Sequence, residues 1–425
     1  FAEIWPLARK PSSAARSQSK SLPMTPGNKS LCQTRSASSA WSAQAFTPHA
    51  GILSPMSNTF PQSASLKILS PAELFTLLTP PMVAEDQSVV SGQSYLLVDL
   101  DQPATREMPT SKPNCPVIGI SQRPNSNKSS SSSSSSSKRS NNEVGISAWV
   151  DLVIHLPEEQ ALLEQIVATI ASQPLAASTF VGVLREAEKL STSQGLMVES
   201  LAYSTLQNGQ GFRTWLSDRS VSAALPQQDA TGQGPVVLVE RSSSAHLAKR
   251  NRDGNRLILT LNRPTKRNAF SAAMRDELAS ALNLALADKS LEHIVLSGNG
   301  PAFCAGGDLT EFGQSQDAAL AHLTRLTRSP ASLMAQLKDR VQVNVHGACI
   351  GAGIELPAFA KTISAQSNSV FALPEVGFGL IPGAGGTVSI PQRIGRQNTA
   401  KLGLSGAPID AQQALTWGLI DVIED

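Results

Sequence analysis

The sequence predicts an α/β protein in which a small α/β module precedes a larger α/β domain. Short apolar runs typical of buried strands alternate with amphipathic helical stretches in both parts. A polar segment at 122–142, with uninterrupted serine at 129–137, divides the first part and predicts a disordered linker. The second part holds two glutamates in apolar surroundings, Glu355 and Glu375, beside glycine-rich turns. We therefore expect three regions, at 1–89, 90–225 and 226–425.

The charge balance excludes two classes of partner. Basic residues number 35 and acidic residues 33, which leaves a net charge of +2 and no electrostatic basis for binding nucleic acid or a membrane surface. No apolar run reaches the roughly 18 residues that a membrane-spanning helix needs. The four cysteines are scattered without metal-ligand spacing, which indicates reduced thiols in a cytoplasmic setting and predicts no metal site.

Residues 1–89 are expected to be a disordered or non-native extension. Most of this stretch is rich in Ser, Ala and Pro and carries many more basic than acidic residues. This composition fits a transit peptide, which would indicate a mitochondrial protein, or translated upstream sequence before a true start at Met56. We favour the second interpretation because no amphipathic helical period is visible. Since the chain begins with Phe1, we expect a fragment or a processed form.

The module at 90–225 combines strands with amphipathic helices. Strands are predicted at 95–100, 116–120 and 149–154, and helical stretches at 158–170, 180–190, 198–206 and 211–216. Its only conspicuous polar residues are His155 and Glu199. We expect both to be solvated or capping residues, and we expect the module to serve packing or assembly.

The larger domain repeats a strand-strand-helix order. The turn Asp253-Gly254-Asn255 joins two predicted strands, and Ser271 is a predicted N-cap for the helix that follows. A long helical stretch from Asp317 to Asp339 is interrupted at Pro330. The remaining predicted elements are strands at 294–296, 341–345, 371–373 and 419–423, and a helix from Asp410 to Gly418.

The two glutamates predict acid-base chemistry. Glu355 lies between Ile354 and Leu356, and Glu375 follows Leu373-Pro374. Apolar surroundings raise the pKa of a carboxyl group, and two such groups in one cleft can act as acid and base near neutral pH. The alternative is two surface glutamates beside glycine turns.

Two loops of small residues follow predicted strands. One runs from Pro301 to Leu309, and the other is Gly351-Ala352-Gly353. If each loop gave one backbone N–H to the same carbonyl oxygen, together they would form an oxyanion hole. Cys304 and Cys349 flank these loops, and we interpret both as small packing residues.

Five motifs in order resemble the crotonase (enoyl-CoA hydratase/isomerase) superfamily over about 235–425. They are LTLNRPTKRNAFS, FCAGGDL, HGACIGAGIEL, LPEVGFGLIPGAGGT and ALTWGLIDVI. The resemblance implies a ββα superhelix. We expect the superhelix of this chain to be C-terminally truncated. The family continues beyond the position of Asp425 with helices that close the coenzyme A pocket and pack between subunits. The chain has Pro357 where the family usually has Ala. A proline is tolerated in the first turn of a helix.

The resemblance also implies roles for single residues. Glu355 and Glu375 are the implied catalytic pair, and the N–H groups of Gly307 and Ala352 form the implied oxyanion hole. The helical stretch after Asp317 would shape the acyl pocket. The implied substrate-binding residues are Arg267, Asn268, Ala269, Ala305, Asp308, Leu309 and Thr310. Lys266 and Arg267 could equally be a solvated face.

The expected function is therefore reversible hydration of a 2-enoyl-CoA. Coenzyme A enters only as part of the substrate, no separate cofactor is implied, and the family assembles as a homotrimer or a dimer of trimers. Double-bond isomerisation or another acyl-CoA reaction is the alternative within the family. A catalytically weak acyl-CoA-binding or scaffold protein is the alternative of a different class, suggested by the split module and the missing helices.

Overall fold

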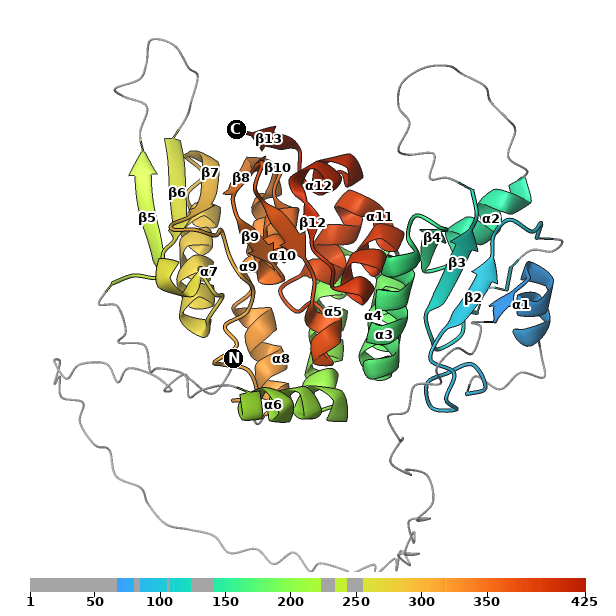
Figure 1. Cartoon of the computed structure of the whole chain (residues 1–425). Coiled ribbons are helices and arrows are strands. Elements are labelled where there is room, and N and C mark those ends of the chain that lie inside the picture. The colour runs from blue at the N-terminus through green and yellow to red at the C-terminus, as the bar shows by residue number, and fades with distance from the viewer. Residues whose placement is uncertain are drawn as a thin grey trace, which may run out of the picture. The chain divides into compact units, whose positions relative to one another are not determined.

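The computed structural model describes residues 67–79, 85–104, 108–109, 111–123, 141–222, 234–242, 255–315 and 317–425, all within one compact unit (Figure 1). The expectations for residues 1–66, and for most of the serine-rich linker, lie outside these residues. The expected lack of a packed core up to residue 89 is wrong for 67–79. There, Ser70 and Glu73 cap helix α1 (Pro71–Leu77) reciprocally, and Leu74 is fully buried.

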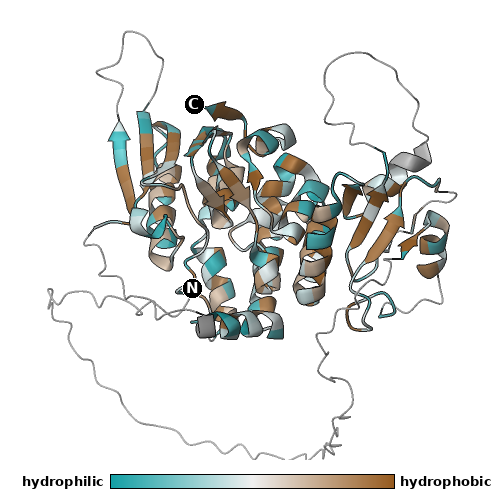
Figure 2. Ribbon diagram, viewed as in Figure 1, coloured by the Kyte–Doolittle hydropathy of each residue, from teal (hydrophilic) through white to brown (hydrophobic). Residues whose placement is uncertain are grey.

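The first sheet has four parallel strands in the order β1-β2-β3-β4. Its strands are β1 (Ile68–Leu69), β2 (Leu96–Asp99), β3 (Val117–Ser121) and β4 (Leu152–His155), with α2 (Asn141–Trp149) between β3 and β4. Every residue of β3 is buried, and Figure 2 shows β2, β3 and β4 as largely hydrophobic. Continuous apolar strands are typical of a parallel sheet that is covered on both faces.

The second sheet has six strands in the order β13-β10-β8-β7-β6-β5, and only the β5–β6 pair is antiparallel. A smaller sheet, β12-β11-β9, lies in the same part of the chain. The strands are β5 (Val237–Ser242), β6 (Asn255–Leu261), β7 (Leu291–Gly298), β8 (Val341–Val345), β9 (Ala348–Ile350), β10 (Thr362–Gln366), β11 (Val370–Ala372), β12 (Ile409–Asp410) and β13 (Val422–Glu424).

The helices of this part begin where the sequence predicts. Ser271 caps α7 (Ala272–Ala287), Pro330 opens α9 (Pro330–Leu337) after α8 (Ala318–Thr327), and Asp410 caps α12 (Ala411–Trp417). Pro357 opens the short turn η5 (Pro357–Phe359) directly after α10 (Ala352–Glu355), so the α10 hydrogen bonds stay intact. The long helix α11 (Gly386–Ser405) is kinked at Gly395.

Strands β4 and β13 are edge strands, and an aspartate directly before each one bonds to the neighbouring strand in the same way. The N–H of Asp151 donates to the carbonyl of Val117 (2.8 Å), and the Asp151 carboxylate accepts the Val117 N–H (2.8 Å). Asp421 makes the same two bonds with Ile363, at 3.0 and 2.7 Å. Each aspartate follows a helix that ends in tryptophan. The two parts of the chain therefore share one arrangement at the beginning of an edge strand, which we call the aspartate bracket.

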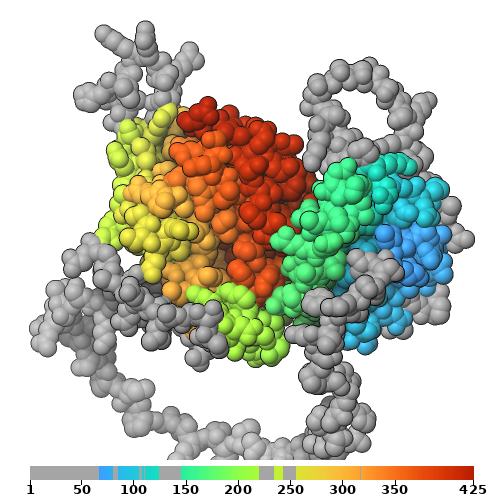
Figure 3. Space-filling model, viewed as in Figure 1, coloured from blue at the N-terminus to red at the C-terminus, as the bar shows by residue number. Residues whose placement is uncertain are grey.

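Four helices follow β4 and pack against the C-terminal part (Figure 3). They are α3 (Gln160–Ser172), α4 (Pro174–Ala187), α5 (Thr192–Gln207) and α6 (Gln210–Ser222). Phe180 and Tyr203 share one hydrophobic cluster with Leu380 and Leu404. Arg396 of α11 also pairs with Asp151 at 3.2 Å. Helices that precede the larger domain therefore cover part of it.

No described helix is by itself long and apolar enough to cross a membrane. Helices α3 and α4 taken together are long and apolar enough, by length and composition only, but the pair is bent by 109°. Both helices direct residues such as Ile166 and Phe180 into the hydrophobic cluster shared with α11.

Candidate active site

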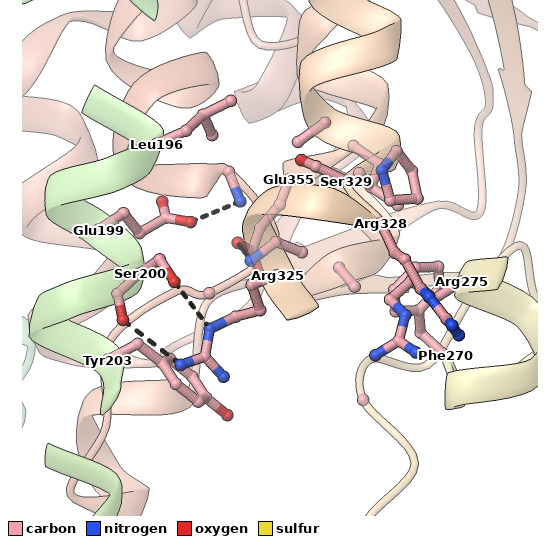
Figure 4. Close-up of a pocket in the computed structure, with 18 of the residues that line it drawn as sticks. Leu196, Glu199, Ser200, Tyr203, Phe270, Arg275, Arg325, Arg328, Ser329 and Glu355 are labelled. Atoms are coloured by element: carbon pink, nitrogen blue, oxygen red, sulfur yellow. Dashed lines mark hydrogen bonds between the residues drawn. The ribbon is translucent and has the colours of Figure 1, made fainter. Parts of the chain in front are cut away.

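Glu355 and Glu375 line the same cavity of about 100 Å³. Glu355 is labelled in the view of this cavity in Figure 4. Glu355 is the last residue of α10, and Glu375 opens the short turn η6 (Glu375–Phe378). Between them lies Gly351, at a φ of 51°. A Cβ atom on Gly351 would stand 2.2 Å from Oε1 of Glu375 and 3.8 Å from Oε1 of Glu355. The backbone thus brings the two carboxylates together.

The Glu355 carboxylate is held by the beginning of α11. Its Oε2 accepts the N–H groups of Ala384 (2.7 Å) and Gly386 (2.9 Å), and the side chain is only 2% exposed. Burial raises the pKa of Glu355 well above its ordinary value, and the nearby Glu375 and Glu199 carboxylates add to this. The two amides act in the opposite direction, since N–H donors and the positive end of a helix favour a charged carboxylate.

Glu375 has the opposite surroundings. Its Oε2 is buried and has no hydrogen-bond partner among the described residues. Burial raises its pKa to about 8, with a contribution from Glu199. Burial therefore raises the pKa of both carboxyl groups. They differ in their donors, because two N–H groups favour a negative charge on Glu355 and none among the described residues does so for Oε2 of Glu375.

The two small-residue loops lie side by side next to the glutamates. The N–H of Cys304 donates to Ala348 (3.1 Å), and the N–H of Ile350 donates to the Cys304 carbonyl (3.0 Å). Gly307 of one loop and Ala352 of the other both line the cavity. Ala352 is the first residue of α10, where an N–H has no acceptor within the helix. This geometry suits an oxyanion hole.

The two cysteines beside these loops are packing residues, as expected. Cys304 and Cys349 are buried, and they pair the loops through a parallel bridge. Burial raises the pKa of the Cys304 thiol to about 12 and that of Cys349 further, so both stay protonated. A protonated thiol is a weak nucleophile.

The predicted substrate-binding residues lie outside the cavity lining, on the loops beside it. Asn268 is fully buried, and its amide group bonds Arg263, Asn299 and Ala302. Asp308 binds Arg263 (2.8 Å) and Thr310 (2.7 Å). The side chains of Asn268 and Asp308 therefore build the loop. The other predicted contacts are Arg267, Ala269, Ala305 and Leu309, of which Arg267 and Leu309 are exposed.

Of the two expectations for Glu199, a solvated residue or a capping residue, the first is wrong and the second is confirmed. Glu199 is 2% exposed, lines the cavity, and caps α11 from a distant helix. Its carboxylate accepts the N–H groups of Gly385 (2.7 Å) and Thr387 (2.9 Å) and the Thr387 hydroxyl (2.7 Å). Burial raises its pKa to about 7. A signal was available, since Leu196, Glu199 and Tyr203 recur at helical spacing on one face.

Arg325 of α8 forms a second wall of the cavity with α5. Its Nε donates to the Ser200 hydroxyl (3.1 Å), Nη2 donates to the Ser204 hydroxyl, and the guanidinium lies 4.6 Å from the centre of the Tyr203 ring (Figure 4). Such a cation-π contact, joined by two hydrogen bonds, fixes a planar cation. The upstream helix α5 and helix α8 are thereby joined at the cavity.

Comparisons with known proteins relate the second part of the chain to one family. A sequence model of the family described as enoyl-CoA hydratase/isomerase matches residues 253–424. The chain is similar to the 2,3-dehydroadipyl-CoA hydratase of Escherichia coli (40% identity, 39% of this chain, 64% of the relative). It is also similar to that organism's 1,2-epoxyphenylacetyl-CoA isomerase (33% identity, 40% of this chain, 66% of the relative).

Among solved structures, an enoyl-CoA hydratase from Thermoplasma volcanium is 33% identical. The match covers 45% of this chain and 73% of that chain, with a TM-score of 0.39. The chain spans 64% of the length of the Escherichia coli hydratase. The matched family region leaves out α3–α6, which contribute Glu199 and Tyr203 to the cavity.

Proposed function

Because residues 253–424 belong to the enoyl-CoA hydratase/isomerase (crotonase) superfamily, we propose that this protein adds water reversibly to a 2-enoyl-CoA thioester. The observation that carries the proposal is the convergence of Glu355 and Glu375 on one cavity that Gly307 and Ala352 also line. A carboxylate pair beside two backbone donors provides a base, an acid and a site for a developing oxyanion.

The thioester carbonyl is proposed to accept the N–H groups of Gly307 and Ala352. Addition of water at Cβ shifts electron density from the double bond to this oxygen, and the enolate-like charge is stabilised there. Loss of one such donor typically lowers the rate by about 100- to 1,000-fold. The cavity sits at the N-terminus of α10, whose positive end adds to the same effect.

The two glutamates divide the proton transfers. Glu355 is held by two amides of the α11 N-terminus. It accepts a proton from a water molecule as the oxygen of that water attacks Cβ. Glu375 is mostly protonated near neutral pH, because its pKa is raised to about 8, and it delivers a proton to Cα. The reverse reaction uses the same groups in exchanged roles, and no net proton is released.

Double-bond isomerisation is the second candidate. The observation in its favour is Glu375 itself, whose buried oxygen lacks a described partner and whose pKa suits proton transfer in both directions near neutral pH. Hydration is preferred because isomerisation needs no activated water, and the amides that hold Glu355 would then have no catalytic use. A binding or scaffold role is disfavoured by the same complete pair.

The assembly follows from the family resemblance alone, and the location from the scattered cysteines. We propose a homotrimer, or a dimer of trimers, in the cytoplasm, with coenzyme A entering only as part of the substrate. Light scattering after size-exclusion chromatography of the purified chain tests the assembly. A monomeric species that turns over substrate at full rate would contradict it.

The activity is tested with crotonyl-CoA and the full chain, by following loss of the enone absorbance. We expect hydration by the wild-type protein and none above background by the Glu375→Gln variant. Product analysis separates the hydroxyacyl thioester from a β,γ-isomer. An isomer without hydrated product would favour the second candidate, and binding without either product would favour the scaffold role.

A further inference from the structure

The first turn of α11 divides its amides between two carboxylates. The N–H groups of Ala384 and Gly386 donate to Glu355, at 2.7 and 2.9 Å. Those of Gly385 and Thr387 donate to Glu199, at 2.7 and 2.9 Å. Four consecutive N–H groups thus alternate between a glutamate of the family domain and a glutamate from the helices that precede it.

We propose that Glu199 is a positioning residue for Glu355. By holding the amides of Gly385 and Thr387, it fixes the turn in the orientation that directs the two intervening amides at the Glu355 carboxylate. This inference rests on the proposed function, in which Glu355 must present one oxygen to water while the other stays bound. Glu199 touches neither water nor substrate in this role.

The packing of α5 explains why Glu199 reaches the turn. A Cβ on Gly195 would stand 2.8 Å from the Val388 side chain, so this glycine lets α5 approach α11. A Cβ on Gly383 would stand 2.5 Å from the Tyr203 ring, so the loop before α11 approaches α5 in the same way. Two glycines, one on each side, bring the Glu199 carboxylate within hydrogen-bond distance.

A carboxylate is the side chain that this turn requires. Oε1 accepts Gly385, and Oε2 accepts both the N–H and the hydroxyl of Thr387. An amide in its place would direct an NH₂ group at one of these donors and leave a buried N–H unsatisfied. The three bonds therefore depend on a group that only accepts.

The charges around Glu199 predict a second effect. Arg325, Tyr203, Glu355 and Glu375 all interact electrostatically with Glu199. The negative charge of Glu199 contributes to the raised pKa values of both Glu355 and Glu375. Its removal should lower the pKa of Glu375. At Glu355, the lost repulsion is opposed by the displacement of the two amides that favour its charged form.

The test compares full-chain Glu199→Gln and Glu199→Asp with the wild type. For Glu199→Gln we expect kcat to fall about 10- to 100-fold, as for a misplaced catalytic group, while KM changes little. The basic limb of the bell-shaped pH profile, which the protonated acid Glu375 sets, should move to lower pH. Glu199→Asp keeps the charge but shortens the reach, so kcat should fall while the basic limb stays in place.

Thr387→Val is the milder variant, because it removes only the hydroxyl bond and keeps the backbone N–H. It should lower kcat by a smaller factor in a folded protein. Glu164→Gln, an exposed change on α3, is the matched control and should match the wild type. Wild-type kcat together with an unmoved pH profile in folded Glu199→Gln would overturn the proposal. If the wild type lacks hydratase activity, only the proposed function fails. The infrared carboxylate stretch of Glu355, identified against Glu355→Gln, would still show whether Glu199→Gln disturbs the hydrogen bonds that hold Glu355, and an unshifted band would overturn the proposal.

Discussion

Gly351 and the Glu375 carboxylate occupy adjoining space that leaves no room for a methyl group. The Cβ of an alanine at 351 would stand 2.2 Å from Oε1 of Glu375, closer than any real contact, and the φ of 51° is itself unfavourable for a residue with a side chain. The glycine therefore sets the position of the Glu375 carboxyl group as well as the direction of the loop. It connects the strand end at β9 to the beginning of α10.

Gly351→Ala should lower kcat by about 100-fold, because the acid must move away from Cα. The matched control is Gly377→Ala. Gly377 lies in the same turn as Glu375, but a Cβ there meets nothing within 4 Å. Crotonyl-CoA kinetics on both folded variants check this. Equal activities would mean that Glu375 tolerates displacement and is not the acid.

Glu375→Gln should reduce hydration by at least about 100-fold, since the amide keeps the shape and cannot deliver the proton. Affinity for a saturated acyl-CoA should stay within a factor of about two, because the loops that carry Gly307 and Ala352 are unchanged. Turnover and calorimetric binding measure the two quantities. A loss of binding together with turnover would indicate a damaged fold.

Glu355→Gln should separate two activities. Hydration should fall by at least about 100-fold, because no base remains to activate water. Exchange of the Cα proton of a β,γ-enoyl-CoA with solvent deuterium should persist, since Glu375 alone can transfer it. Mass spectrometry of the recovered thioester measures the exchange. Equal loss of both activities would contradict the division of roles.

The melting temperature should fall as pH rises from about 5.5 to 8.5. The folded-state pKa values of Glu199 (about 7) and Glu375 (about 8) lie above the value of an unfolded glutamate, so the folded chain binds more protons in this interval. The stability that these protons contribute is complete below the unfolded pKa and is lost as pH rises through 7 to 8. The Glu199→Gln/Glu375→Gln double variant should flatten the slope, whereas Glu164→Gln should not. A rising melting temperature would contradict the burial of these groups.

Asp151→Ala should destabilise the protein by about 3–5 kcal/mol, because it leaves buried cations uncompensated. The carboxylate is 1% exposed and pairs with Arg185 (2.9 Å) and with Arg396 of α11 (3.2 Å). Glu188 also pairs with Arg396, but it is 55% exposed, so Glu188→Ala should change the unfolding free energy by at most about 1 kcal/mol. Denaturant unfolding compares the two variants.

The family domain could be predicted from the sequence because its signals are local. Ser271, Pro330 and Gly418 mark helix ends through chemistry that acts within one turn, and the apolar setting of Glu355 is visible in its immediate neighbours. The packed helix at 71–77 had such a signal as well, in the pairing of Ser70 with Glu73.

Glu199 could not be predicted in the same way. Its hydrogen-bond partner Gly385 stands 186 positions further along the chain, so nothing in its own helix shows which amides it meets. The covering role of α3–α6 depends on the same kind of long-range contact. Asn268 shows the converse case. Its position in the motif is visible in the sequence, but its side-chain amide donates to the carbonyls of Asn299 and Ala302 within the protein.

The two aspartate brackets give the folding chain two docking places of equal backbone geometry. Strand β4 could offer its pair of hydrogen bonds to β10, and β13 could offer the same pair to β3. The cations distinguish the two places, because Asp151 meets Arg185 and Arg396 whereas Asp421 meets Arg393 at 3.1 Å. The two places are therefore alike in their backbone hydrogen bonds and differ in the cations that face the aspartate.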